Sequence, residues 1–77
     1  MKPIKHIIAR EASCYLAVSK VDVKIETMKA DLKPANGLQV AAMIAAPPAY
    51  AVVATAAGHY RRMSAARAEY DAKHPAE

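Results

Sequence analysis

Apolar residues recur at alternating intervals of three and four between residues 4 and 32. Eight of the nine positions on this stripe are apolar, and the nine are Ile4, Ile7, Glu11, Cys14, Val18, Val21, Ile25, Met28 and Leu32. A period of 3.5 residues over four heptads is typical of an amphipathic helix with one buried face. Pro3 suits a first helical turn. The pattern predicts one helix over about residues 3–33, roughly 45 Å long.

Residues 21–26 carry a competing pattern, because apolar and polar residues alternate there as they do in a half-buried strand. A single strand would have no partner in this chain, and isolated strands are not stable. The helix is therefore the leading interpretation and the strand is the alternative. Residues 34–37, with the sequence Pro-Ala-Asn-Gly, predict a turn after the helix, since Pro34 disfavours helix at Lys33 and Asn-Gly is a turn dipeptide.

Residues 38–57 contain no charged side chain. Twenty such residues in a helix measure about 30 Å, the thickness of the hydrocarbon core of a bilayer. Lysines precede the segment and Arg61 and Arg62 follow it, as is typical of the flanks of a membrane span. We therefore expect a single transmembrane helix at 38–58, which continues into a juxtamembrane helix and tail of mixed charge at 59–77.

This predicted span is only weakly hydrophobic, because alanine supplies much of it. Pro47 and Pro48 remove two backbone donors and predict a kink. A weak, kinked span needs neighbouring helices. Small residues spaced by four would let such helices approach closely, and the candidate packing residues are Ala42, Ala46, Ala54 and Gly58, with Ala45 and Ala49 at the same spacing.

The composition points the same way. A chain of 77 residues is one domain at most, and its single cysteine, Cys14, allows no internal disulfide. It has neither Trp nor Phe, and an alanine-rich core buries little area, so apolar surface is expected to face lipid or partners. The net charge of +4 is a mild bias that suits anionic lipid or an acidic partner.

No combination of residues predicts catalysis or a cofactor. The serines lack a nearby base and an orienting acid, and Cys14 lies on the apolar stripe. The three histidines, His6, His59 and His74, are too far apart to predict a metal site. Acidic residues are interleaved with the basic ones and no aromatic cluster is present, so we expect no nucleic-acid binding. The expectation is a non-catalytic protein without metal or cofactor.

Two surfaces are candidates for binding. Tyr60, Arg61 and Arg62 would lie at a membrane interface, where they contact lipid head groups or a partner carboxylate, or act as a plain flank anchor. The N-terminal stripe would dock on a partner protein, since its mixed charges differ from the uniformly basic face of lipid-seeking helices. The residues of this predicted docking stripe are Ile4, Ile7, Val18, Val21, Ile25, Met28 and Leu32.

These patterns predict an all-α chain with a long amphipathic helix, a short turn and one proline-kinked transmembrane helix. The leading hypothesis for function is a single-span accessory subunit that braces larger membrane subunits and contacts lipid. We expect it in an energy-converting complex of the mitochondrial inner membrane, such as a respiratory-chain complex. The alternatives are a soluble helical adaptor or oligomeric binding module, with helices near 3–33, 38–46 and 49–73, and a small phage or bacterial membrane protein.

Overall fold

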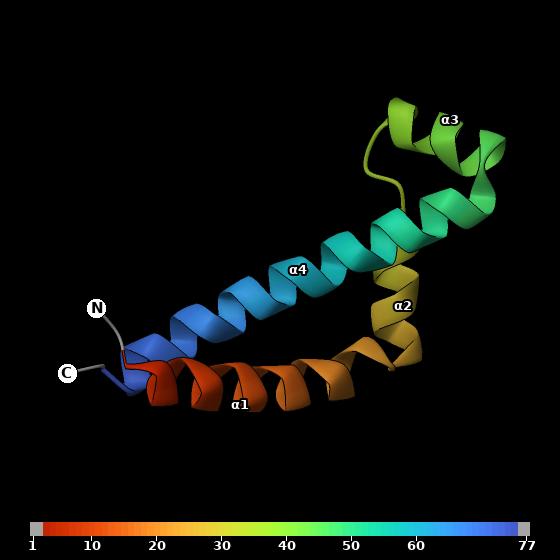
Figure 1. Cartoon of the computed structure of the whole chain (residues 1–77). Coiled ribbons are helices and arrows are strands. Elements are labelled where there is room, and N and C mark those ends of the chain that lie inside the picture. The colour runs from red at the N-terminus through yellow and green to blue at the C-terminus, as the bar shows by residue number, and fades with distance from the viewer. Residues whose placement is uncertain (1–2, 76–77) are drawn as a thin grey trace.

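The computed structural model describes residues 3–75, and these residues form four α-helices and no strand (Figure 1). The predicted all-α class is confirmed. Residues 1, 2, 76 and 77, which belong to the predicted segments 1–33 and 59–77, lie outside the described residues. The helices are α1 (Ile4–Asp22), α2 (Ile25–Leu32), α3 (Gly37–Ala45) and α4 (Pro47–Lys73).

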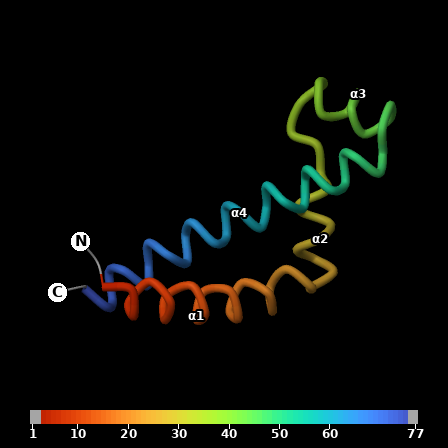
Figure 2. The backbone as a smooth tube through the Cα atoms, viewed as in Figure 1, coloured from red at the N-terminus to blue at the C-terminus, as the bar shows by residue number. Residues whose placement is uncertain are grey.

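The long helices α1 and α4 lie side by side and run in opposite directions, so that α1 begins where α4 ends (Figures 1 and 2). The short helix α2 leaves the end of α1 and crosses α4, and α3 packs on the first turns of α4. The molecule is elongated, with extents of 49 × 24 × 17 Å. One end is therefore a two-helix hairpin, and the other is a junction of α2, α3 and α4.

The N-terminal helix is not continuous. It breaks between α1 and α2, where Val23 still has helical dihedrals but Lys24 is extended, with φ −71° and ψ 138°. Val21, Val23 and Ile25 are β-branched, and such residues lose side-chain freedom in a helix. The same alternation suggested a strand at 21–26, but the residues form the end of α1, a bend and the start of α2. The break lets α2 turn away toward α4.

The turn at 34–37 is held by a reciprocal cap. The Asn36 side chain accepts a hydrogen bond from the backbone N–H of Gln39 at 2.9 Å. The Gln39 Oε1 atom in turn accepts from the backbone N–H of Ala35 at 2.6 Å. The N-cap Asn36 and the third helical residue Gln39 thus satisfy one backbone donor inside the helix start and one just before the cap. Lys33 is extended because it precedes Pro34, and α2 therefore ends at Leu32. The cap at Asn36 places the start of α3 at Gly37.

The two prolines end one helix and start another. Ala46, with φ −144° and ψ 67°, separates α3 from α4, and Pro47 and Pro48 are the first residues of α4. Proline fits this position because the first helical N–H groups have no intrahelical acceptor. The chain turns sharply here, and α3 lies back over α4 (Figure 2). The predicted kink within one helix at 38–58 is therefore a complete break between two helices.

The transmembrane interpretation is wrong. Within residues 3–75, no helix combines the length and the apolar character that a bilayer crossing requires. The break at Ala46 leaves α3 with only nine residues, and α4 soon reaches Arg61 and Arg62. The predicted integral-membrane localisation, including the mitochondrial inner membrane, is corrected accordingly.

Among the described residues, the buried apolar core is small. Cys14 and Val18 on α1 meet Met63 on α4, and Ala66 and Tyr70 pack beside them. Cys14 and Val18 are four residues apart and Met63 lies opposite, as expected for two facing helices. With so little apolar burial, polar contacts between the helices acquire structural importance.

Candidate functional site

Ion pairs join α1 to the C-terminal half of α4. At the open end of the hairpin, His6 Nε2 lies 2.9 Å from Asp71 Oδ1, and Arg10 Nη1 donates to Asp71 Oδ2 at 3.0 Å. One helical turn further along, Arg67 donates to both carboxylate oxygens of Glu11 through Nε and Nη2, at 2.9 to 3.1 Å. Such paired contacts orient the two helices as well as attract them.

A second group of ion pairs joins α4 to both α1 and α2 where these helices meet. Arg62 Nε donates to Asp22 Oδ1 at 2.6 Å, and the two Nη atoms donate to both oxygens of Asp31 at 2.9 and 2.8 Å. His59 Nδ1 lies 2.5 Å from the other oxygen of Asp22. A single guanidinium thus connects three helices, and it fixes the angle at which α2 leaves α1.

These contacts shift the titration of the carboxyl groups. Hydrogen bonds from Arg67 lower the pKa of Glu11, and those from Arg62 lower the pKa of Asp31. At Asp22 burial alone would raise the pKa, but hydrogen bonds from His59 and Arg62 outweigh it and the net shift is downward. The pKa of the Arg62 guanidinium is raised by its hydrogen bonds to Asp31. All three carboxylates are therefore held in the charged form.

Gly58 is buried beneath this group of ion pairs. A Cβ placed on Gly58 would overlap with the carboxyl group of Asp31, whereas one on Gly37 would meet nothing. The Asp31 side chain is only 6% exposed and is fixed by Arg62. The close approach of α2 to α4 thus requires a residue without a side chain at position 58.

The charged clusters fit a structural role better than a chemical one. His6 and His59 each face one aspartate, His74 stacks on Tyr70, and no group of three His, Cys, Asp or Glu side chains comes together among residues 3–75 to hold a metal ion. Arginine binds both oxygens of Glu11 and of Asp31. Cys14 is buried in the apolar core.

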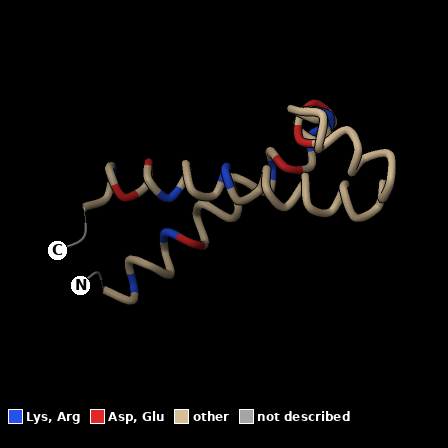
Figure 3. The backbone as a smooth tube through the Cα atoms, turned by 90° about the horizontal axis from the view of Figure 1, so that it is seen from above, with Lys and Arg blue, Asp and Glu red and all other residues tan. Residues whose placement is uncertain are grey.

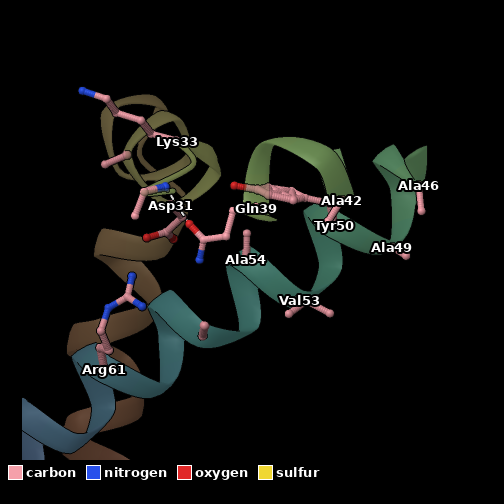
Figure 4. Close-up of a pocket in the computed structure, with 13 residues that line it drawn as sticks. Asp31, Lys33, Gln39, Ala42, Ala46, Ala49, Tyr50, Val53, Ala54 and Arg61 are labelled. Atoms are coloured by element: carbon pink, nitrogen blue, oxygen red, sulfur yellow. Dashed lines mark hydrogen bonds between the residues drawn. The ribbon is translucent and has the colours of Figure 1, made fainter. Parts of the chain in front are cut away.

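A groove of about 510 Å³ lies at the junction of α2, α3 and α4 (Figure 4). Small side chains form most of its wall, and the larger Tyr50 and Val53 rise from α4. The Tyr50 hydroxyl donates to the carbonyl oxygen of Leu32 at 2.9 Å, which ties the base of the groove to the end of α2. The alanines that line the groove are Ala30, Ala35, Ala42, Ala46, Ala49, Ala54 and Ala57.

Polar and charged groups lie at one side of the groove. Asp31, Lys33, Gln39 and Arg61 line it there, and Figure 4 shows the Arg61 guanidinium reaching toward the side where Asp31 lies. Since Arg62 takes both oxygens of Asp31, that carboxylate is already neutralised. No hydrogen bond or ion pair engages Lys33 or Arg61 through its side chain within the described residues. The rim of the groove is therefore cationic.

The predicted docking stripe is divided by the break between the first two helices. Val18 is buried against α4, whereas Ile4 and Ile25 are 74% and 66% exposed. The remaining members keep between 37% and 40% of their surface exposed, and they are Ile7, Val21, Met28 and Leu32. Val18 thus contacts α4 of the same chain, whereas Ile4 at the start of α1 and Ile25 at the start of α2 stay largely exposed.

The residues predicted for helix packing lie near the junction, whereas those predicted for lipid head groups do not stay together. Ala42, Ala46 and Ala54 line the groove, and Gly58 lies against Asp31. The predicted head-group residues separate: Tyr60 is 69% exposed, Arg61 lines the groove and Arg62 binds the two aspartates.

The uncharged segment forms an apolar surface outside the groove. Leu38 and Ile44 on α3 and Val52 on α4 all rank among the most exposed large apolar side chains, and Leu38 is 82% exposed. Figure 3 shows that charged residues follow the hairpin and the α2 crossing but are absent from α3 and the start of α4. We name Leu38, Ile44 and Val52 the apolar end.

Sequence reasoning did not identify the acidic partners, which are Glu11, Asp22, Asp31 and Asp71. One signal was present: Glu11 stands alone among eight apolar residues on the stripe, and a charge there requires a partner on the facing helix. The sequence also contained a signal for the start of α3, because Asn36 followed by Gln39 is a helix-start signature.

Comparison of the chain with protein-family models, with characterised proteins and with solved structures finds no match.

Proposed function

We propose that this chain is a non-catalytic binding module that docks on a larger protein through its apolar end. The observation that carries the proposal is a group of exposed apolar side chains in a part of the chain that has no charged residue. Leu38, Ile44 and Val52 are between 68% and 82% exposed, and residues 38–57 contain no charged side chain. Exposed apolar surface without charge on a small protein is typical of an interaction site.

The occupant proposed is a protein because the surface has the composition of an interface core. Charged residues are depleted at the centre of protein interfaces and surround it at the rim. Here residues 38–57 are uncharged. Lys33 precedes them in the sequence, Arg61 follows them, and both line the groove. The hairpin provides a support for this end, since the ion pairs of Arg62 with Asp22 and Asp31 fix α1 and α2 against α4, on which α3 packs.

The proposal keeps the accessory, non-catalytic role expected from the sequence and drops the membrane span. Bracing a larger assembly requires a rigid shape and a surface that can bind a partner. The ion pair between Arg62 and Asp31 supports the first, and the exposed Leu38, Ile44 and Val52 support the second. No catalytic step is assigned to the chain, because arginine binds the carboxylates of Glu11 and Asp31 and the thiol of Cys14 is buried.

The test is capture of partners from the source cells with the tagged chain, followed by chemical cross-linking and mass spectrometry. Leu38→Asp and Ile44→Asp should abolish recovery of a partner that the unaltered chain recovers in stoichiometric amount. Ile8→Asp, at a similarly exposed apolar position on α1, is the matched control and should leave recovery unchanged.

Three results would count against the proposal. One is equal loss with Ile8→Asp, which would move the contact to α1. Another is a cross-link map restricted to copies of this chain, which would indicate self-association. The third is recovery only with lipid vesicles, without a protein partner.

A further inference from the structure

We propose that the groove between α2, α3 and α4 binds a single-chain amphiphile with a carboxylate head, such as a free fatty acid. The alkyl chain would lie along the alanine wall and the carboxylate on Arg61. This inference goes beyond the proposed docking role and does not depend on it, since the groove and the apolar end expose different side chains.

The size of the groove favours a small molecule. Its volume of about 510 Å³ falls within the range of roughly 300–1,000 Å³ that is usual for ligand pockets. An α-helix of about 10 Å diameter occupies roughly 420 Å³ per turn, so the groove has room for little more than one turn of a partner helix. A flexible alkyl chain fits such a space more completely than a helix does.

The wall is suited to an alkyl chain. Alanine methyl groups from α3, α4 and the residue between them, including Ala42, Ala46 and Ala49, form an apolar surface without bulky projections. Tyr50 crosses the groove with its hydroxyl already bonded to Leu32, so the ring offers an apolar face without an unsatisfied donor.

The charge at the rim selects the head group. Neither Arg61 nor Lys33 makes a hydrogen bond or ion pair through its side chain within residues 3–75. Lys33 points away from the groove, whereas Arg61 extends toward Asp31 on the side where the charged residues gather, and its charge helps to lower the pKa of Asp31 (Figure 4). Guanidinium binds carboxylate through two parallel hydrogen bonds. A head group with one negative charge is matched by the single guanidinium of Arg61.

The experiment is a titration of the isotope-labelled chain with monomeric decanoate, followed by backbone NMR spectra. We expect saturable shifts confined to residues around Ala42, Ala49 and Ala57. Decanol, which has the same chain without charge, should bind about tenfold more weakly, because one charge-assisted hydrogen-bond pair is lost. Arg61→Gln should weaken decanoate by about the same factor and leave decanol unchanged.

Two further variants make the test decisive. Ala54→Leu fills the groove and should abolish binding of both probes, whereas Lys5→Gln removes an exposed cation of α1 and should change neither. The spectra of each variant report directly whether the fold is retained. Equal affinity for decanoate and decanol, retention of decanoate affinity in Arg61→Gln, or shifts centred on α1 would overturn the assignment. Binding only to anionic vesicles, without binding to monomeric decanoate, would overturn it as well.

Discussion

Arg62 on α4 holds Asp31 on α2 through two parallel hydrogen bonds of 2.9 and 2.8 Å. The Asp31 side chain is almost fully buried, although it belongs to a helix that otherwise buries no residue. Because α2 has no apolar residue in the core, this contact is the main attachment of α2 to α4. Asp31 lines the groove, and Arg62 also binds Asp22 at the end of α1, so the contact connects the groove to the hairpin.

Replacement of Arg62 should therefore destabilise the fold, although the sequence Arg61-Arg62 by itself suggests two exposed side chains. Arg62→Met leaves the Asp31 carboxylate buried without a partner, and we expect a loss of about 1–3 kcal/mol in the free energy of unfolding. Lys73→Met, which removes an exposed pair with Glu69, is the control and should have almost no effect. Urea unfolding followed by circular dichroism measures both. Equal stability of the two variants would show that the contact does not attach α2.

The glycine beneath this contact gives a second prediction. Gly58→Ala should destabilise the chain, because the added methyl group overlaps with Asp31, which Arg62 prevents from moving. Overpacking costs about 1–3 kcal/mol, and the better helix propensity of alanine returns up to about 1 kcal/mol. The net expectation is a lower melting temperature.

Gly37→Ala is the matched control for this substitution. Gly37 is also helical, but open space surrounds its Cα, so alanine there should be neutral or slightly stabilising. A stabilised Gly58→Ala variant would mean that α2 and α4 are further apart than described.

The heptad stripe identified buried residues of α1 but did not predict where the helix ends. The positions of Cys14 and Val18 on the stripe identified residues that are buried. The regular spacing continued past Val23, however, and gave no sign that the backbone becomes extended at Lys24. Periodicity records which face is apolar, but it does not register a change of helix direction that tertiary ion pairs such as Asp22–Arg62 stabilise.

The membrane prediction failed for a related reason. Twenty uncharged residues satisfy the length requirement only if they form one helix with a kink at Pro47-Pro48, whereas the alternative with helices near 38–46 and 49–73 places a boundary there. Two consecutive prolines fit a first helical turn better than a helix interior, where each would clash with a preceding carbonyl. The groove itself could not be predicted, because it exists only once α3 folds back over α4 and α2 crosses beside them.

Acid should weaken the fold through three of its paired carboxylates. Glu11, Asp22 and Asp31 have pKa values below their ordinary 4.5, 3.8 and 3.8 in the folded chain. The unfolded chain therefore binds protons first as the pH falls, so the stability that these groups contribute is present above about pH 5 and is lost progressively below it. Urea unfolding near neutral pH and at about pH 3 measures the difference. In the variant Asp22→Asn/Asp31→Asn the dependence on pH should be smaller, and an unchanged dependence would assign it to other groups.

The two prolines give a prediction about shape. Ala46 has dihedrals outside the helical region, and Pro47 and Pro48 are what prevent α3 and α4 from joining, because proline clashes with the preceding turn. In Pro47→Ala/Pro48→Ala the 37 residues from Gly37 to Lys73 could form one helix of about 55 Å. Small-angle scattering should then give a radius of gyration above the 15.6 Å of the described backbone, together with a higher helical content by circular dichroism. Pro34→Ala, in the extended segment before α3, removes a proline without joining α3 to α4 and serves as the control. An unchanged radius in the double variant would show that the packing of α3 on α4, rather than the prolines, sets the fold at this end.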